Sequence, residues 1–260
     1  TSGFHPPWVS MPSILVIGGS DSSGGAGVFA DLKTCHDLES EACAAITAVT
    51  AQSNHRQYHS HAMPAPTLRS QLHSVSPDEI DAIKIGMLPN LESIEVVGEF
   101  LEGFPPNRVV LDPVFSSSSG GSLSTVEGVV ALDESLFHLV GLITPNLFEA
   151  ERLIGQAGLE ADSQTELALA CLRLGSPAVL LKGGHYSGEE CTDLLALEGG
   201  ETFVFSRKRI PGGSQVRGTG CRLATAITCL LARERGLREA VGEACRYLAA
   251  YIESKMEDSG

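Results

Sequence analysis

Short apolar runs of strand type alternate with stretches of helical periodicity along almost the whole chain. Ser13–Ile17 is an apolar run, a glycine-rich segment follows it, and Gly27–Leu38 then carries apolar residues at helical spacing. The same order of apolar run, turn and helix recurs after Ala82–Ile85 and after Val109–Leu111. Strands that alternate with helices are connected by crossovers. The chain is therefore predicted to be an α/β protein with a mostly parallel central sheet flanked by helices on both faces.

The remaining periodic segments fit the same architecture. Further strands are expected at Cys43–Thr50 and Leu139–Ile143, with a hairpin of Thr192–Leu197 and Thr202–Phe205. Further helices are expected at Thr67–Val75, Leu91–Leu101, Thr125–Leu136, Phe148–Ile154, Thr165–Leu174, Cys221–Arg233 and Glu239–Ser254. No linker rich in Pro or Ser divides the chain, so residues 11–260 are predicted to form a single domain. Residues 1–10 would then be an extension before a native Met11, either artificial or natural.

The charge balance and the cysteines narrow the classes of function. The 260 residues include 18 Lys and Arg against 32 Asp and Glu, which gives a formal net charge of −14. Nucleic acids and anionic membrane surfaces need a positive footprint, so neither partner is expected. No apolar stretch reaches the roughly 18 residues of a transmembrane helix. The seven cysteines include no CxxC pair, which favours reduced thiols and a cytoplasmic location.

Polar and glycine-rich segments follow most of the expected strands. In such sheets, ligands bind beyond the carboxyl ends of the strands. One such segment, Gly218–Cys221 with the sequence GTGC, opens a long helix. Its glycines allow backbone N–H groups to approach a ligand, and a helix N-terminus favours negative charge. We therefore expect an anion-binding turn here, with a purely structural turn as the alternative. The absence of the pattern GxxxxGK(S/T) excludes a P-loop enzyme.

Eight short motifs occur in a fixed order between about Ile14 and Ala250. They are GGSDSSGGAG (18–27), ADLKT (30–34), ITAVTAQ (46–52), KIGM (84–87), LDPV (111–114), ITPNLFEAE (143–151), LKGGH (181–185) and GTGC (218–221). With these motifs the chain resembles the hydroxymethylpyrimidine kinase/phosphomethylpyrimidine kinase family of the ribokinase-like superfamily. The resemblance implies a ribokinase-like fold, a homodimer, and phosphorylations that use ATP and Mg²⁺. The acceptors would be 4-amino-5-hydroxymethyl-2-methylpyrimidine and then its monophosphate, in thiamine biosynthesis.

The resemblance implies that five residues contact the pyrimidine substrate. It implies that Asp31 and Gln52 bind the aminopyrimidine, whose amine and ring nitrogens suit a carboxylate and an amide. It also implies substrate contacts from Gly19, Met87 and Val114. Plain core packing is the alternative for Met87 and Val114, and a solvated charge is the alternative for Asp31.

Asn146 and Glu149 form an NxxE motif, which the resemblance links to Mg²⁺ and to the phosphates of ATP. Mg²⁺ takes few protein ligands and keeps several waters, so two sparse oxygen ligands are reasonable. The same spacing is typical of a helix N-cap with a capping box, and the two roles can coexist. By the same resemblance, Asp112 supports the metal and Lys182 lies near the ATP phosphates.

Cys221 occupies the place where related sugar kinases have an aspartate base. A thiol at a helix N-terminus has a lowered pKa and can accept a proton. The resemblance implies that Cys221 deprotonates the hydroxymethyl group. It also implies that the amides of Gly218, Thr219 and Gly220 stabilise the γ-phosphoryl charge, the two glycines also binding ATP. The alternative is that Cys221 is a small buried hydrophobe, the role expected of the other cysteines.

Three segments depart from the family pattern near the expected phosphate site. Gln215–Arg217 replace the usual Asn-Thr-His, Ser118 stands in place of a lysine, and Arg222 opens a changed segment after GTGC. We hypothesise that Arg217 and Arg222 restore the missing positive charge. The changes also indicate altered preference between the two phosphorylations, or reduced activity.

Two other functions are compatible with the same motifs. One is a pyridoxal kinase of the same superfamily, whose acceptor is a similar heteroaromatic alcohol; Gln52 and Met87 in their motifs favour the pyrimidine. The other is a catalytically weak paralogue that keeps the pyrimidine pocket, which the changes at Gln215–Arg217 and Ser118 favour.

Overall fold

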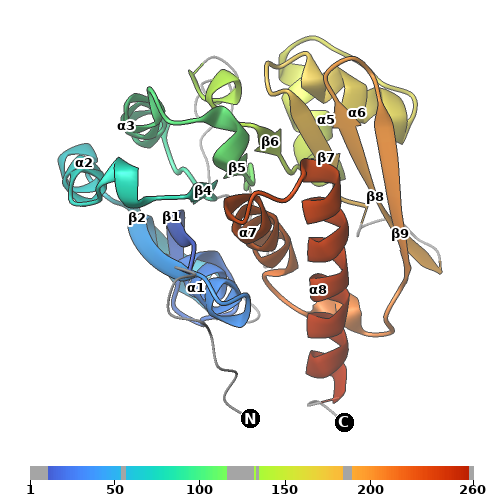
Figure 1. Cartoon of the computed structure of the whole chain (residues 1–260), viewed down its shortest axis with the longest axis horizontal. Helices are drawn as coiled ribbons and strands as arrows, with labels where there is room; N and C mark the ends of the chain where they lie inside the picture. Colours follow the sequence, from blue (N-terminus) through green and yellow to red (C-terminus); the bar gives the residue numbers. More distant parts are fainter. Residues whose placement is uncertain (1–10, 54–56, 116–131, 133–134, 184–188, 258–260) are drawn as a thin grey trace.

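The computed structural model describes residues 11–53, 57–115, 132, 135–183 and 189–257. Nine strands in these ranges form one sheet (Figure 1). They are β1 (Ser13–Asp21), β2 (Glu41–Gln52), β3 (Gln57–Ala62), β4 (Ala82–Ile85), β5 (Val109–Leu111), β6 (Leu142–Ile143), β7 (Ala178–Leu181), β8 (Glu190–Leu197) and β9 (Thr202–Lys208). Their order in the sheet is β3-β2-β1-β4-β5-β6-β7-β8-β9.

The six central strands are parallel, and the antiparallel pairings lie toward the edges. β2, β1, β4, β5, β6 and β7 pair in parallel. β3 runs antiparallel to β2, and β8 and β9 form an antiparallel ladder beside β7. The mostly parallel sheet predicted from the alternation of strands and helices is therefore confirmed. Because parallel strands share one direction, the carboxyl ends of all six meet at one edge.

Seven α-helices in the described ranges cover both faces of this sheet (Figure 1). They are α1 (Gly27–Asp37), α2 (Ala65–His73), α3 (Leu91–Leu101), α5 (Leu147–Gln156), α6 (Gln164–Leu172), α7 (Thr219–Ala232) and α8 (Leu237–Glu257). One core contains residues of α2, α3, α5 and α6, and two smaller cores contain residues of α1, α7 and α8. None of these helices combines the length and hydrophobicity that crossing a membrane requires.

Alternation along single strands places side chains in these separate cores. In β1, Leu15 and Ile17 belong to the larger core, whereas Ile14 and Val16 pack under α1. Because successive side chains of a strand point to opposite faces, a continuous apolar run is needed when both faces are covered. That requirement explains why β5, β6 and β7 consist entirely of aliphatic residues and why β1 contains an aliphatic run.

Some boundaries differ from those expected. β3 was not predicted, because its sequence QYHSHA is polar and none of its residues is buried at the edge of the sheet. The strand expected at Leu139–Ile143 is only Leu142–Ile143, since Phe137–Leu139 forms a short 3₁₀ turn. The helix expected at Thr125–Leu136 lies almost wholly outside the described residues, as does Ser118.

Replacing Ile83 with Ala should lower the free energy of unfolding by about 2–5 kcal/mol, because a fully buried side chain leaves a cavity in the larger core. Replacing Val204 on β9, which is 61% exposed, with Ala should change it by less than about 0.5 kcal/mol. Urea denaturation measures both values. Equal stabilities of the two variants would contradict the position of Ile83 in the core.

Candidate active site

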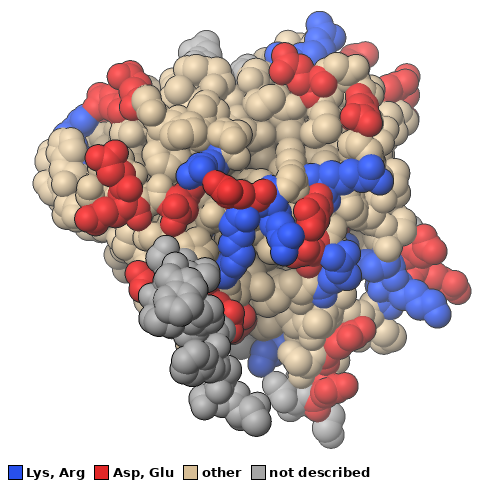
Figure 2. Space-filling view, in the orientation of Figure 1, with Lys and Arg blue, Asp and Glu red and all other residues tan. Residues whose placement is uncertain are grey.

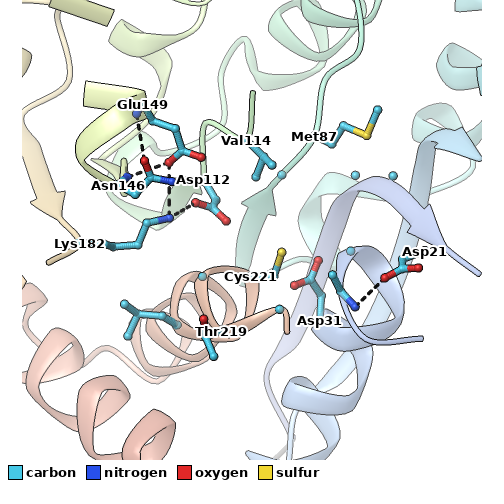
Figure 3. A pocket seen from close by; sticks show the side chains of 18 of the residues that line it. Asp21, Asp31, Met87, Asp112, Val114, Asn146, Glu149, Lys182, Thr219 and Cys221 are labelled. Atoms are coloured by element: carbon cyan, nitrogen blue, oxygen red, sulfur yellow. Dashed lines mark hydrogen bonds and ion pairs between the residues drawn. The ribbon is translucent and has the colours of Figure 1, made fainter. Parts of the chain in front are cut away.

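A pocket of about 530 Å³ lies at the carboxyl ends of the parallel strands. Thirteen residues expected from the sequence to form the site all line it: Gly19, Asp31, Gln52, Met87, Asp112, Val114, Asn146, Glu149, Lys182, Gly218, Thr219, Gly220 and Cys221. Figure 3 shows Lys182, Asp112 and Glu149 at one end and Asp21 and Met87 at the other. Cys221 lies between the two ends. The topology therefore brings these residues together from segments far apart in the sequence.

The first turn of α5 positions Asn146 and Glu149. The Asn146 side chain accepts from the backbone N–H of Glu149 at 3.0 Å, and the Glu149 carboxylate accepts from the N–H of Asn146 at 2.7 Å. These reciprocal bonds are the capping box that the spacing predicted. They also fix the Glu149 side chain at the pocket wall, so the cap itself holds a carboxylate in the site.

Lys182 neutralises two carboxylates at this end of the pocket. Its Nζ lies 2.6 Å from Oδ1 of Asp112 and 3.8 Å from Oε2 of Glu149. Burial raises the pKa of Glu149 to about 7; attraction to Lys182 opposes this, and the nearby Asp112 adds to it. The single ammonium of Lys182 therefore faces two carboxyl groups, and it cannot neutralise both when both are ionised.

The donor set at this end suits Mg²⁺. In the described part of the chain, the hydrogen bonds of Asp112 use Oδ1 and those of Glu149 use Oε2. Oδ2 and Oε1 thus remain for a ligand, and buried carboxylates short of positive charge attract a hard cation. No three His, Cys, Asp or Glu side chains gather as a metal group within the described ranges. Few protein ligands and several waters are what Mg²⁺ accepts.

The glycine turn before α7 exposes backbone amides to the pocket. Gly218 is the N-cap with φ of 70°, and a Cβ there would lie 2.2 Å from the carbonyl oxygen of Gly25. Only glycine fits so close an approach. No side chain caps α7 among the described residues, so the amides of its first turn are available to an anion. A Cβ at Gly220 would lie 3.2 Å from Nζ of Lys182, which places this cation beside the turn.

Cys221 differs from the expectation in its acidity. Burial raises the pKa of the thiol to about 11, although Lys84 and the N–H of Gly27 oppose the rise. The lowered pKa expected from the helix N-terminus is therefore wrong, because the loss of solvent around the sulfur outweighs the helix effect. At neutral pH and without ligands, Cys221 is a protonated thiol.

A buried ion pair between β4 and α1 forms part of the pocket lining. Nζ of Lys84 on β4 is 2.9 Å from Oδ2 of Asp31 on α1, and both side chains are 1% exposed. The hydroxyl of Thr225 on α7 donates to Oδ1 of Asp31 at 2.8 Å. Burial is the largest single influence on Lys84 and disfavours its charge, but the attraction and hydrogen bond of Asp31, together with the nearby Cys221 and Asp112, raise the Lys84 pKa above its usual value. The alternative that Asp31 is a solvated charge is therefore wrong.

The part of the pocket around Met87, at the other end from Lys182, is mainly apolar. A Cβ at Gly19 would lie 2.7 Å from Sδ of Met87, so these two residues are packed together. The hydroxyl of Thr47 donates to the Met87 carbonyl at 2.6 Å and fixes that segment. Val114 and Gln52 complete this end of the pocket. Met87 is 7% exposed, so it packs as a core residue and lines the pocket at once.

Arg217 does not reach the end of the pocket that holds Lys182. Its guanidinium pairs with Asp21 at 3.1 Å and donates to Oγ of Ser23 at 2.9 Å and to the carbonyl of Ser53 at 3.0 Å. It thus joins the loop after β1 to the end of β2. Its partner Asp21 lies at the opposite end of the pocket from Lys182, so the hypothesis that Arg217 restores positive charge at the phosphate end is wrong.

Arg222 is also placed differently from the hypothesis. It is 3% exposed, lies outside the pocket, and donates to Oγ1 of Thr34 at 3.2 Å. Its guanidinium carbon lies 4.0 Å from the centre of the Tyr251 ring. The side chain therefore joins α1 and α8 behind the site, because position 222 faces away from the pocket on α7.

Several pocket residues had no assigned role in the sequence. Asp193 on β8 is buried, accepts from the N–H of Gly183 at 2.9 Å and pairs with Arg207 on β9. Lys84 lies within a motif that was recognised, but nothing local indicates its partner. Asp193 and Arg207 belong to a hairpin without any motif, so only tertiary structure places them in the pocket.

Comparisons with known proteins place the chain among kinases. The family described as phosphomethylpyrimidine kinase matches residues 21–259. The hydroxymethylpyrimidine/phosphomethylpyrimidine kinase of Haemophilus influenzae is 38% identical over 247 residues, which cover 94% of this chain and 91% of that protein. A bifunctional thiamine biosynthesis protein of Geobacter sulfurreducens is 40% identical over 92% of this chain, which spans 49% of that longer protein.

Solved structures agree with this placement. The phosphomethylpyrimidine kinase of Clostridium difficile 630 has a TM-score of 0.78 at 33% identity and covers 93% of this chain and 99% of its own. The pyridoxal kinase of Staphylococcus aureus in complex with pyridoxal has a TM-score of 0.83 at 29% identity, with coverages of 94% and 89%. The ribokinase-like fold expected from the motifs is therefore confirmed.

Replacing Lys84 with Met should lower the free energy of unfolding by about 3–5 kcal/mol at pH 7, because the Asp31 carboxylate would remain buried without an opposite charge. The loss should shrink as the pH falls toward 5. Burial raises the Asp31 pKa, so without Lys84 the carboxyl is protonated more readily and the unpaired charge disappears.

Lys33, exposed on α1, provides the control, since Lys33→Met should change stability by less than about 0.5 kcal/mol. Urea denaturation of both variants at pH 7 and pH 5 measures the effect. A loss for Lys84→Met that is independent of pH would argue against a charged partner at Asp31.

Proposed function

We propose that this chain, which belongs to the phosphomethylpyrimidine kinase family, transfers the γ-phosphoryl group of ATP to 4-amino-5-hydroxymethyl-2-methylpyrimidine and then to the resulting monophosphate. The observation that carries the proposal is the place of Cys221 in the pocket. Its thiol lies between a mainly apolar wall with Met87 and Val114 and an anion-binding end with Lys182. A heteroaromatic alcohol on that wall would meet a proton acceptor and the phosphate site together.

The first transfer requires the removal of one proton. The hydroxymethyl oxygen forms a bond to Pγ while the bond from Pγ to the β,γ-bridging oxygen breaks, and ADP leaves. The hydroxyl proton passes to the sulfur of a deprotonated Cys221. The first-turn amides of α7 and the ammonium of Lys182 offset the charge on the transferred group.

The second transfer differs at the attacking atom. The oxygen of the monophosphate is already anionic, so it attacks Pγ without losing a proton to the protein. The same amides and Lys182 serve both transfers, whereas Cys221 acts as a base only in the first. The two reactions therefore depend on this residue to different extents.

Asp112, Asn146 and Glu149 would hold Mg²⁺, in part through water. When bound, Mg²⁺ neutralises charge on the β- and γ-phosphates. Gln52 and Asp31 would orient the pyrimidine, with Gly19 beside Met87 allowing its close approach. On the family resemblance we also propose a homodimer and a cytoplasmic location; light scattering after gel filtration tests the first.

Pyridoxal is the second candidate acceptor, because the pyridoxal kinase of Staphylococcus aureus has the same fold over 94% of this chain. Turnover with ATP and Mg²⁺ should be measured with hydroxymethylpyrimidine, its monophosphate and pyridoxal in parallel. We expect turnover of both pyrimidines. Turnover of pyridoxal alone would overturn the substrate, and binding of the pyrimidine without any turnover would point to a non-catalytic paralogue.

Replacing Cys221 with Ala should reduce the first phosphorylation by about 10²–10⁴-fold, the usual contribution of a general base. The second phosphorylation should fall by less than tenfold, because its nucleophile has no proton to lose. Steady-state rates with the alcohol and with the monophosphate measure this ratio. Equal losses in both reactions would show that Cys221 is not a base.

The pH profile supplies a second readout. A thiol with a pKa of about 11 is deprotonated in a fraction that rises about tenfold per pH unit below that value. The first rate should therefore rise between pH 7 and pH 9 in the native enzyme, and this slope should vanish in Cys221→Ala. A flat profile in the native enzyme would contradict the role of the thiolate.

A further inference from the structure

Arg152 on α5 lines the pocket and lies against the ring of Phe115. It follows Glu149 by three residues on α5, so both side chains lie on one face of that helix. Its guanidinium carbon lies 5.3 Å from the centre of the Phe115 ring, and Phe115 is itself buried next to Val114. This cation–π contact holds the guanidinium against the wall of the pocket. Arg152 and Phe115 both line the pocket.

The other basic side chains that line the pocket are already paired. The ion pairs are Asp31–Lys84, Asp112–Lys182, Glu149–Lys182 and Asp193–Arg207. Asp21, also in the pocket lining, pairs with Arg217. Within the described residues, Arg152 makes no ion pair. It therefore differs from the other lining cations in that no carboxylate of the described residues neutralises its charge.

The segment of the chain that contains Val114 and Phe115 has no lysine or arginine of its own. Residues 109–151, which supply β5, β6 and the start of α5, contain no Lys or Arg. Figure 2 shows basic and acidic side chains interleaved near the middle of this face, around the position of α7. Arg152 directly follows this segment, so it is the first lysine or arginine that this part of the chain supplies to an anion on the wall formed by Val114 and Phe115.

We propose that Arg152 binds the phosphate monoester of the phosphorylated acceptor in the second transfer, an inference that rests on the proposed function. A guanidinium offers a planar fork of donors that fits phosphate oxygens in bidentate geometry. The position between Val114 and Glu149 matches a phosphate attached to a pyrimidine on the apolar wall and directed toward the metal end. The unphosphorylated alcohol has no charge and gains nothing from this contact.

The test is calorimetric binding of hydroxymethylpyrimidine and of its monophosphate, without nucleotide, to the native protein and to Arg152→Gln. The substitution should weaken binding of the monophosphate by about tenfold or more, the contribution expected of a charge-assisted contact. Binding of the alcohol should stay within about twofold. Arg152→Lys, which keeps the charge without the fork, should give a smaller loss, and it carries the test should Arg152→Gln fail to fold.

Arg238→Gln is the matched control, because Arg238 also lies over an aromatic ring, 4.2 Å from the centre of Phe203, but outside the pocket. It should leave both affinities unchanged. Three results for Arg152→Gln would overturn the assignment: equal loss of affinity for both pyrimidines, no loss for either, or a loss of affinity for ADP with none for the monophosphate. If the native protein binds neither pyrimidine, the proposed function itself fails. If the native protein and Arg152→Gln bind both pyrimidines equally well, only the role of Arg152 fails.

Discussion

The ion pair between Lys84 and Asp31 joins the sheet to α1 and α7 at the lining of the pocket. Two charges at 1% exposure are stable only together, since either alone would lack both solvent and an opposite charge. The pair therefore couples the stability of the central strands to the position of Asp31, which is proposed to orient the pyrimidine. Cys221 lies above it, and its acidity reflects the same exclusion of water.

Charge pairing explains how an acidic chain can accommodate an anionic substrate. Each carboxylate named in the pocket lining has a basic partner, so the pocket does not repel phosphates as the net charge of −14 would suggest. Lys182 serves two carboxylates and leaves room for a divalent cation. Arg152 then supplies charge on the wall where the acceptor is proposed to bind. Local pairing, rather than overall charge, determines what the site attracts.

The parts of the site that sequence predicted are those built from contiguous residues. The capping box of Asn146 and Glu149 and the glycine turn at Gly218 each follow from local spacing. The role of Arg217 was mispredicted because its partner Asp21 is 196 residues away. The acidity of Cys221 was mispredicted because burial, which depends on every neighbouring element, outweighed the local effect of the helix terminus.

The sequence by itself determined the alternation of strands and helices, the parallel sheet and the motifs at the strand ends, because period and turn chemistry are local properties. Only the tertiary structure decided which charges meet. Asp193 and Arg207 line the pocket although their hairpin carries no motif. Arg222 points away from the pocket, and Arg152 has no ion-pair partner among the described residues. Electrostatic partnership depends on distances of a few ångströms between remote segments, and no local pattern encodes those distances.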